Sequence, residues 1–265
     1  MDHGAASAPP ASGSGMASDV ATPPRPVGPR QVLAEIPWLF SVPAGTLDRL
    51  AEHAVMHRVP AGSLLFEQAE TPAFAPFLIG GCIELLAVRD SDEVLVELAR
   101  PIDLLIPAAV LNCQPYLLRA RVLEEAQLLL VQAATFRDLV AADHALALAM
   151  LACQAAQFRR QVKQVKNVKL RAAEERVGCY LVRLLEVAPP GRPVRLPLEK
   201  RLIASQLGMT RETFSRALAA VTRHGLLVDG DRVVLTDAAA AQARFPADPL
   251  IDGGEAILPL SAKRP

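Results

Sequence analysis

The stretch Lys200–Leu227, KRLIASQLGMTRETFSRALAAVTRHGLL, predicts two short helices that meet at a tight turn. Gly208 ends the first helix, because glycine enters the left-handed region of backbone space more freely than other residues. Thr210 is a suitable N-cap for the second helix, since its hydroxyl can accept a hydrogen bond from an unpaired amide of the first turn. One face of the first helix is apolar, with Ile203, Ala204 and Leu207 at helical spacing.

The second helix of this stretch separates apolar from polar side chains. Its inner face is expected to carry Phe214, Leu218 and Val221. Its outer face is expected to carry Arg211, Glu212, Ser215 and Arg216. Polar groups near the N-terminus of an exposed helix are what a helix-turn-helix places in the major groove of DNA. On this pattern alone, two surface helices whose charges merely face water remain an alternative.

The string T-R-E-T-x-S-R at residues 210–216 resembles the recognition helix of the Crp/Fnr family of bacterial transcription regulators. The flanking sequence agrees with that resemblance. A short strand is expected at Arg195–Leu198, and a hairpin at Leu226–Leu235 with Asp229-Gly230 as its two-residue turn. Together these segments predict a winged helix-turn-helix.

The resemblance also implies roles for individual residues of the two helices. Arg211, Glu212, Ser215 and Arg216 take the base-reading positions, while Lys200, Arg201, Thr210 and Thr213 take positions that contact phosphates. An arginine can donate two bonds to guanine, and a glutamate can accept one from the cytosine amine. The E-x-x-S-R set is of the Fnr type. It therefore implies a palindrome of TTGAT-like half-sites, rather than the TGTGA of cyclic-AMP-dependent relatives.

Length and charge restrict the classes of function. A chain of 265 residues is long enough for about two domains. Lys+Arg and Asp+Glu both number 28, so any attraction to DNA must be local, through Lys200, Arg201, Arg211, Arg216 and Arg223.

No apolar run approaches the roughly 20 residues of a membrane span, and no signal-peptide pattern is present. We expect a cytoplasmic protein with no membrane partner. No nucleophile elbow, phosphate loop or metal-ligand spacing suggests an enzyme.

The four cysteines are Cys82, Cys113, Cys153 and Cys179, and no two form a C-x-x-C pair. We expect them to be small buried hydrophobic residues in a reducing cytoplasm. Oxygen-sensing members of the Fnr branch carry N-terminal cysteines for an iron–sulfur cluster, and no cysteine precedes Cys82, so such a cluster is not expected. Residues 1–30 are rich in Ala, Pro, Gly and Ser and are predicted to form a disordered tail.

Residues 31–135 are predicted to form an effector or sensor domain. Short helices are expected between Ile36 and Val59, including Ala44–His53 with Leu47 and Leu50 facing inward. From Gly62 to Val131 the chain reads as strands separated by turns, with turn signals at Gly80-Gly81 and at residues 89–92. That spacing indicates a small antiparallel barrel or roll. It resembles the eight-stranded β-roll that the family shares with cyclic-nucleotide-binding domains.

The stretch Asp103–Val122, DLLIPAAVLNCQPYLLRARV, departs from a cyclic-nucleotide pocket. Ile106, Pro107 and Ala108 stand where Gly-Glu is expected, and Tyr116, Leu117 and Leu118 where Arg-Ser is expected. Arg119 and Arg121 lie nearby, but they alternate along a strand and are expected on one solvated face. A phosphate without those donors would be poorly neutralised. Cyclic AMP is therefore not an expected ligand.

Haem remains open, because some relatives use it to sense carbon monoxide or nitric oxide. The available axial ligands would be His53, His57, His144 and Cys82, and none stands in a motif that assigns it. The cofactor is thus unknown. An alternative function is a ligand-gated or haem-gated gas or redox sensor whose DNA binding depends on the effector.

Residues 136–170 predict one long helix with a coiled-coil seam. Apolar residues spaced 3, 4, 3, 4 and 3 apart form that seam, namely Leu148, Leu151, Ala155, Phe158, Val162 and Val165. Packing on the chain's own barrel could explain part of the pattern, but a helix of about 30 residues spans about 45 Å. The resemblance implies the dimerisation helix. Basic residues that mostly avoid the seam are expected to face solvent: Arg159, Arg160, Lys163, Lys166 and Lys169.

Residues 171–245 are predicted to be the DNA-binding domain. Its start, Ala172–Val177, resembles the hinge that follows the dimerisation helix in the family, and the prolines of Ala188–Pro193 should end its first helix. An alanine-rich helix is expected after Thr236, and residues 246–265 should be a loose tail. The predicted fold class is α+β: an antiparallel β-roll, a long dimerisation helix and a C-terminal winged helix-turn-helix. The resemblance implies a homodimeric DNA-binding regulator that contacts RNA polymerase, as an activator does.

Overall fold

The computed structural model describes Met1, residues 28–186 and residues 192–254. Most of the tail expected at residues 1–30 therefore lies outside the described residues, and its last two residues belong to the first helix, α1 (Pro29–Glu35). Most of the proline-rich segment that should end a helix at residues 188–193, and the chain from residue 255 onward, also lie outside them.

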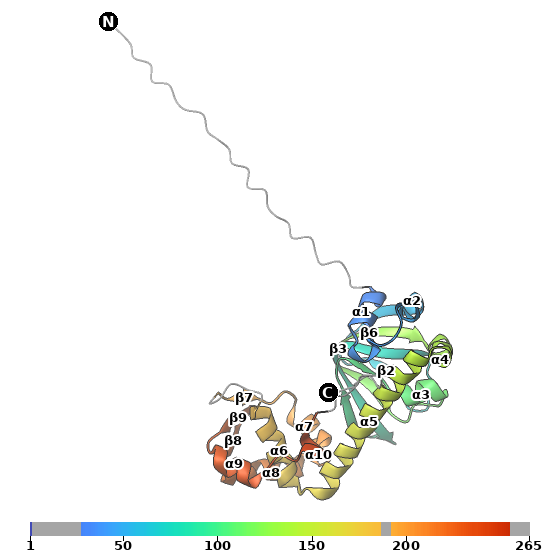
Figure 1. The fold of residues 1–265 in the computed structure, drawn as a ribbon. Helices are drawn as coiled ribbons and strands as arrows, with labels where there is room; N and C mark the ends of the chain where they lie inside the picture. Colours follow the sequence, from blue (N-terminus) through green and yellow to red (C-terminus); the bar gives the residue numbers. More distant parts are fainter. Residues whose placement is uncertain (2–27, 187–191, 255–265) are drawn as a thin grey trace.

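The N-terminal unit is an antiparallel sheet with helices at one end and along one side (Figure 1). The main path of the sheet runs β1-β6-β3-β4, while β2 pairs with β6 and β5 pairs with β3. The strands are β1 (Ala54–Val59), β2 (Leu64–Phe66), β3 (Phe74–Arg89), β4 (Asp92–Ala99), β5 (Asp103–Leu104) and β6 (Arg119–Gln132). The described residues thus form a six-stranded sheet rather than the expected eight strands. In addition, β1 occupies a segment that we expected to be helical.

The Gly80-Gly81 pair is a bulge inside β3 and not the turn that the sequence suggested. The pairing of β3 with β6 shifts register between Leu78 and Ile83, yet the strand continues to Arg89. Gly81 has φ of 85°, and a Cβ there would lie 2.2 Å from the carbonyl oxygen of Glu125. Only glycine allows β6 to approach so closely at a positive φ.

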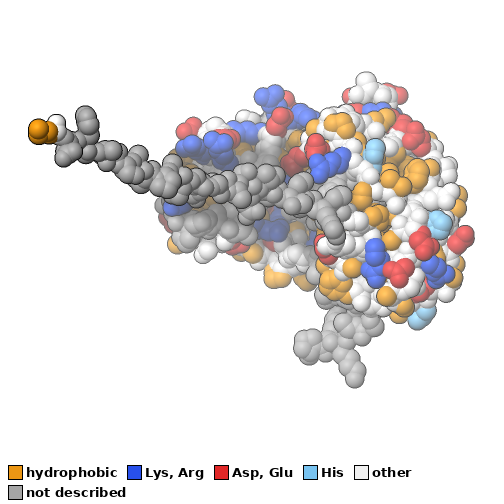
Figure 2. Space-filling model, turned by 90° about the horizontal axis from the view of Figure 1, so that it is seen from above, with side chains coloured by type: hydrophobic (Ala, Val, Ile, Leu, Met, Phe, Trp, Pro, Cys, Tyr) orange, Lys and Arg blue, Asp and Glu red, His pale blue; other side chains and the backbone are white. Residues whose placement is uncertain are grey.

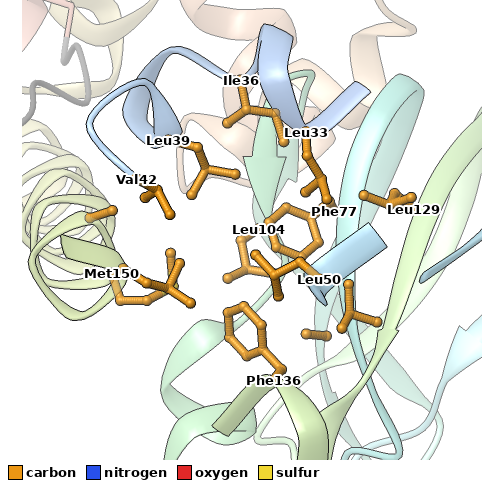
Figure 3. Close-up of a cluster of buried hydrophobic side chains, with 14 of the residues drawn as sticks. Leu33, Ile36, Leu39, Val42, Leu50, Phe77, Leu104, Leu129, Phe136 and Met150 are labelled. Carbon is orange, nitrogen blue, oxygen red and sulfur yellow. The ribbon is translucent and has the colours of Figure 1, made fainter. Parts of the chain in front are cut away.

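The core of this unit lies between the sheet and several helices: α1, the short 3₁₀ helix η1 (Pro37–Leu39), α2 (Ala44–Glu52), α3 (Pro107–Asn112), α4 (Ala133–Ala142) and α5 (His144–Leu170). Phe77 of β3 is at its centre (Figure 3). Its ring stacks on Trp38 at 5.9 Å and meets Phe136 edge-on at 5.8 Å. Leu47 and Leu50 of α2 face this core, as expected.

The helix expected over residues 136–170 is two helices, α4 and α5, which meet at an angle of 112°. Asp143 separates them, because its carboxylate caps α5 by accepting from the amide of Leu146 at 2.9 Å. The same carboxylate also accepts from the hydroxyl of Thr46. Within the described chain no single helix is long and apolar enough to cross a membrane. Helices α4 and α5 meet that length and composition only if they are taken together, in spite of the bend between them.

The C-terminal unit is a small helical domain with a three-stranded sheet, ordered β7-β9-β8. Its elements are α6 (Ala173–Glu186), β7 (Val194–Arg195), α7 (Lys200–Gln206), α8 (Arg211–Val221), η2 (Thr222–His224), β8 (Leu226–Asp229), β9 (Arg232–Leu235), α9 (Ala238–Arg244) and α10 (Pro249–Asp252). Asp229 pairs with Arg232, so the hairpin turn is at Gly230 and Asp231, one residue later than expected.

Two features connect the units. Helix α5 runs from the roll to the C-terminal unit, and α7 lies against β4, where the amide of Leu95 donates to the hydroxyl of Ser205 at 3.0 Å (Figure 1). Residues 246–254 do not form the loose tail that we expected. They include α10, which packs against α5.

Candidate nucleic-acid interface

The turn between α7 and α8 has the geometry that the sequence predicted. Gly208 has φ of +64°, and a Cβ there would lie 2.9 Å from Val168 of α5. The guanidinium of Arg176 donates to the carbonyl oxygens of Leu207 at 2.7 Å and of Gly208 at 3.2 Å. These bonds satisfy carbonyl groups at the end of α7 and hold the turn in place.

Helix α8 has an N-cap and is amphipathic, as expected. The hydroxyl of Thr210 accepts from the amide of Thr213 at 3.2 Å, which satisfies one of the unpaired donors of the first turn. The apolar face is buried in the domain core: Phe214, Ala217, Leu218 and Val221. The four side chains expected to read bases are all exposed on the other face: Arg211, Glu212, Ser215 and Arg216.

The electrostatics of α8 suit contact with base edges. The backbone amide of Glu212 and then the hydroxyl of Thr210 lower the pKa of the Glu212 carboxyl. That group is therefore ionised at neutral pH and able to accept from an exocyclic amine. Arg211 and Arg216 lie nearby and also lower this pKa.

The side chains expected to contact phosphates lie at the beginnings of α7 and α8. Lys200, Arg201 and Thr210 are exposed, and Thr213 is half-buried. Thr210 also donates to the Thr213 hydroxyl at 3.1 Å. The fifth local cation, Arg223, is exposed in η2, directly after α8.

Helix α5 leaves the predicted seam uncovered. Its core-facing side is made of Leu146, Ala149, Met150, Cys153 and Ala156. The seam residue Leu148 is half-buried and Ala155 is exposed. The larger seam side chains are also exposed: Leu151 by 58%, Phe158 by 70%, Val162 by 41% and Val165 by 57%. An apolar stripe of this kind on one chain is typical of an interaction surface.

A cavity of about 780 Å³ lies between α5, β4, β5 and α3 (Pro107–Asn112), and is here called the apolar cavity. Its wall includes Ile106, Ala108, Leu117 and Leu118, which are four of the six residues that replace the cyclic-nucleotide contacts in the sequence. Several polar side chains that the sequence did not assign to a pocket also line it, among them Glu97, Asp103, Gln157, Arg160 and Gln161. The available signal was Glu97, an acid between the apolar residues Val96 and Leu98, and Asp103, which precedes the apolar run 104–106.

These polar side chains form one network. Arg160 donates to Glu97 at 3.3 Å and also to Asp103, so it is not the solvated residue that we expected. Gln161 donates to Glu97 at 2.7 Å, and Gln157 donates to Asp103 at 2.8 Å. Burial raises the pKa of both carboxyl groups, with Arg160 opposing the rise.

Arg119 and Arg121 are not directed at this cavity. Arg119 pairs with Glu67 at 2.7 Å and with Glu93, while Arg121 pairs with Glu84 and Glu93, each at 2.8 Å. The two arginines share one face of β6, as expected, but carboxylates already engage their guanidinium groups. A phosphate in the apolar cavity would find neither of them as a donor.

The four residues considered as haem ligands do not line the apolar cavity. His53, His57 and His144 are exposed, and Figure 2 shows histidine side chains at the surface of the molecule. Cys82 is buried in β3, and burial raises the pKa of its thiol. Among the residues that the structure describes, the lining has no imidazole, thiol or thioether, so the cavity does not fit haem held by one of these as an axial ligand.

The cysteines depart from expectation at one position. Cys113 is exposed, because it follows α3 in the left-handed conformation with φ of 51°. Cys82, Cys153 and Cys179 are buried. Burial raises the pKa of all three thiols, that of Cys153 to about 12, which makes them poor nucleophiles.

Comparisons with known proteins agree with this geometry. Residues 175–243 match a model of the Crp-like helix-turn-helix domain, and residues 56–143 match one of the cyclic nucleotide-binding domain. Among curated proteins, no sequence matches the chain.

Solved structures share its fold. FixK2 from Bradyrhizobium japonicum is 20% identical with a TM-score of 0.60, and the match covers 74% of this chain and 98% of FixK2. The c-di-GMP responsive regulator CLP from Xanthomonas campestris is 18% identical with a TM-score of 0.60, and the match covers 74% of this chain and 100% of CLP. A Ruegeria pomeroyi protein described as cyclic nucleotide binding is 24% identical with a TM-score of 0.54, and the match covers 83% of this chain and 98% of that protein.

Proposed function

Because this chain belongs to the Crp/Fnr family of transcription regulators, with a cyclic nucleotide-binding domain followed by a Crp-like helix-turn-helix, we propose that it binds a palindromic DNA site as a homodimer. The half-sites are TTGAT-like. The protein works in the cytoplasm without enzymatic activity, and it acts on transcription through RNA polymerase.

The observation that carries the proposal is the outer face of α8. Glu212, Ser215 and Arg216 are exposed together on a helix whose other face is buried and whose first turn is capped by Thr210. Glu212 is ionised and can accept a hydrogen bond from the cytosine amine. Arg216 can donate hydrogen bonds to guanine O6 and N7. Arg211 completes the base-reading set. Lys200, Arg201, Thr210 and Thr213 contact phosphates and fix register.

Dimerisation is supported by the exposed seam of α5. A stripe from Leu151 to Val165 at coiled-coil spacing would be covered by the same stripe of a second copy. A dimer with two recognition helices also explains a two-fold symmetric target, because each helix reads one half-site.

The apolar cavity supports a second function, gating of DNA binding by an effector. Its wall is apolar and its charged groups are engaged with one another, so it suits an uncharged apolar molecule better than cyclic AMP or haem. The cavity adjoins both β4 and α5. Each of these elements also contacts α7, through Ser205 and Gln206 respectively.

The DNA-binding proposal is tested by selecting duplexes from a random pool. Wild-type protein should recover a two-fold symmetric motif. Arg216→Ala should cost about 1–3 kcal/mol and relax preference at one base pair. Lys200→Ala is the matched control: it should weaken all sequences alike and reduce the salt slope by about one unit. The assignment is wrong if no symmetric motif emerges, or if Arg216→Ala leaves the motif unchanged.

Effector gating is tested with the neutral fluorescent probe N-phenyl-1-naphthylamine. The probe should bind the wild type and bind Ala108→Trp more weakly, because an indole would fill the apolar cavity. Ala141→Trp, at an exposed site on α4, should bind it as the wild type does. Equal binding by all three proteins would count against the cavity as a ligand site. A Soret absorption band in the isolated protein would instead establish haem.

A further inference from the structure

Residues 246–254, here called the strap, cross from the DNA-binding domain to α5. The strap leaves the domain at Phe245, whose ring lies so close to α6 that a Cβ at Gly178 would be 2.3 Å from it. The thiol of Cys179 then contacts the carbonyl oxygen of Pro246 at 3.9 Å. Asp248 caps α10 by accepting from the amide of Leu250 at 2.8 Å.

The strap ends at the hinge, the two residues Arg171 and Ala172 that separate α5 from α6. Arg171 forms a bidentate salt bridge with Asp252, with nitrogen–oxygen distances of 2.7 Å and 2.6 Å. The side chains are only 11% and 10% exposed, respectively. Burial by itself would raise the pKa of Asp252, but bonds from Arg171 and from the amide of Asp248 outweigh it and lower the pKa. The pair is therefore ionised at neutral pH.

Cations of α5 hold the rest of the strap. Lys163 donates to the carbonyl oxygen of Gly253 at 2.7 Å, and Lys166 donates to that of Leu250 at 3.3 Å. A cavity of about 260 Å³ beside them is lined by five cationic side chains: Arg160, Lys163, Arg171, Arg176 and Arg183. Among the described lining side chains, Asp252 is the one carboxylate. The strap thus places a carboxylate in a strongly cationic junction.

We propose that Arg171 and Asp252 are positioning residues for DNA binding, which fix the angle between α5 and α6 and thereby the spacing of half-sites that the dimer accepts. Only two residues link these helices. The strap bonds one of them, Arg171, through Asp252, and it is held on α5 by Lys163 and Lys166. The strap therefore restricts the orientation of the domain relative to α5, in addition to the contacts of α7 with β4 and α5. The proposal rests on the two-half-site binding proposed above.

The consequence for DNA is specific. A fixed orientation benefits the second recognition helix, because the first contact then places it at a defined distance from its half-site. Binding of one α8 to one half-site does not need that distance. Loss of the strap contact should therefore affect palindromes and leave single half-sites unaffected.

The test compares Asp252→Asn with Asp231→Asn, which removes an exposed acid paired loosely with Arg195. Asp252→Asn should lower the affinity for the selected palindrome by roughly tenfold or more and accept a wider range of spacer lengths. Its affinity for a single half-site should equal that of the wild type. Arg171→Lys keeps the charge but not the bidentate geometry, so its affinity for the palindrome should lie between those of the wild type and Asp252→Asn. Asp231→Asn should behave as the wild type.

A second measurement needs no DNA. Spin labels at the exposed Cys113 and at Asp229→Cys in the hairpin report the distance between the roll and the DNA-binding domain. Labelled chains are diluted with unlabelled protein so that one distance within a chain is measured. The distribution should be narrow in the wild type and broad in Asp252→Asn and, less so, in Arg171→Lys. Circular dichroism confirms that each variant is folded.

The outcomes separate the two proposals. Unchanged distance distributions in Asp252→Asn and Arg171→Lys would overturn the positioning role, as would a palindrome affinity that falls only in step with half-site affinity. If the wild type binds no palindrome while the spin-label distances still broaden, the proposed DNA site is wrong and the mechanical role of the strap stands.

Discussion

At the scale of single residues, Glu97 and Asp103 show most directly what burial does to chemistry. Both carboxyl groups lie in the wall of the apolar cavity and share Arg160 as their cation. One guanidinium between two acids leaves the network with an excess of negative charge when both are ionised. Burial is the main cause that raises both pKa values, even though each group is hydrogen-bonded, and the charge of Asp103 adds to the rise at Glu97.

This network predicts a pH dependence of stability. A carboxyl group whose pKa is higher in the folded state holds more protons there than in the unfolded chain, so the free energy of unfolding falls as pH rises from the unfolded pKa through the raised folded pKa. Glu97→Gln should make that fall smaller. Urea denaturation at a series of pH values from 4 to 8 measures it, with Glu52→Gln at an exposed site of α2 as the control. Parallel curves for the wild type and Glu97→Gln would contradict the assignment.

Residue identities were predictable where the backbone itself dictates the side chain. Gly208 and Thr210 were found because a left-handed residue and an N-cap have few alternatives. Arg160 and Cys113 were misjudged for the opposite reason. The partners of Arg160 are at least 57 residues away in sequence, and the exposure of Cys113 depends on how α3 ends.

At the scale of elements, close packing of α6 against the chain after α9 explains why residue 178 is glycine. A Cβ on Gly178 would lie 2.3–2.5 Å from atoms of the Phe245 ring, and Phe245 is itself buried. By contrast, a Cβ on Gly45 of α2 would meet nothing within 4 Å. Packing thus explains the glycine at position 178 but not the one at position 45.

We therefore predict opposite effects of alanine at these two positions. Gly178→Ala should destabilise the DNA-binding domain by about 1–3 kcal/mol, because the ring must move to admit the methyl group. Gly45→Ala should stabilise by about 0.5–1 kcal/mol, because alanine restricts the unfolded chain without a clash. Chemical denaturation of both variants measures the difference. A stable Gly178→Ala protein would mean that Phe245 is not held against α6.

Elements with strong local periodicity were predicted well, including α8 and, to within one residue of its turn, the hairpin after it. The errors arose where tertiary contacts decide. Asp143 divides a continuous helical pattern by capping α5 and bonding to Thr46, ninety-seven residues earlier. Likewise, Gly80-Gly81 reads as a turn locally but lies opposite β6, which keeps the strand extended as a bulge.

At the scale of the whole molecule, the seam of α5 predicts assembly. Phe158→Glu would place like charges opposite each other across a dimer axis, where their desolvation is costly, so this variant should sediment as a monomer. Val55→Glu introduces the same charge at an exposed apolar site on β1 and should leave assembly unchanged. Analytical ultracentrifugation at micromolar concentration decides the matter. A monomeric wild type, or a dimeric Phe158→Glu, would contradict the prediction.

The whole molecule should also be indifferent to cyclic AMP. Arg119 and Arg121 are engaged by carboxylates. In the described lining of the apolar cavity the one guanidinium is that of Arg160, which is paired with Glu97 and Asp103. Millimolar cyclic AMP should therefore change neither the melting temperature nor the affinity for DNA, because only a ligand that binds the folded state stabilises it. A clear rise in melting temperature would show that cyclic AMP binds the folded protein and that this prediction is wrong.

The exposed seam has a consequence for how the regulator responds to its own abundance. If pairing through Phe158 and its neighbours is required to occupy an operator, the occupied fraction at low expression grows with the square of the number of copies in the cell. A twofold change in synthesis would then produce up to a fourfold change in promoter occupancy. The stripe of four apolar side chains would thus turn a graded supply of protein into a threshold in gene expression.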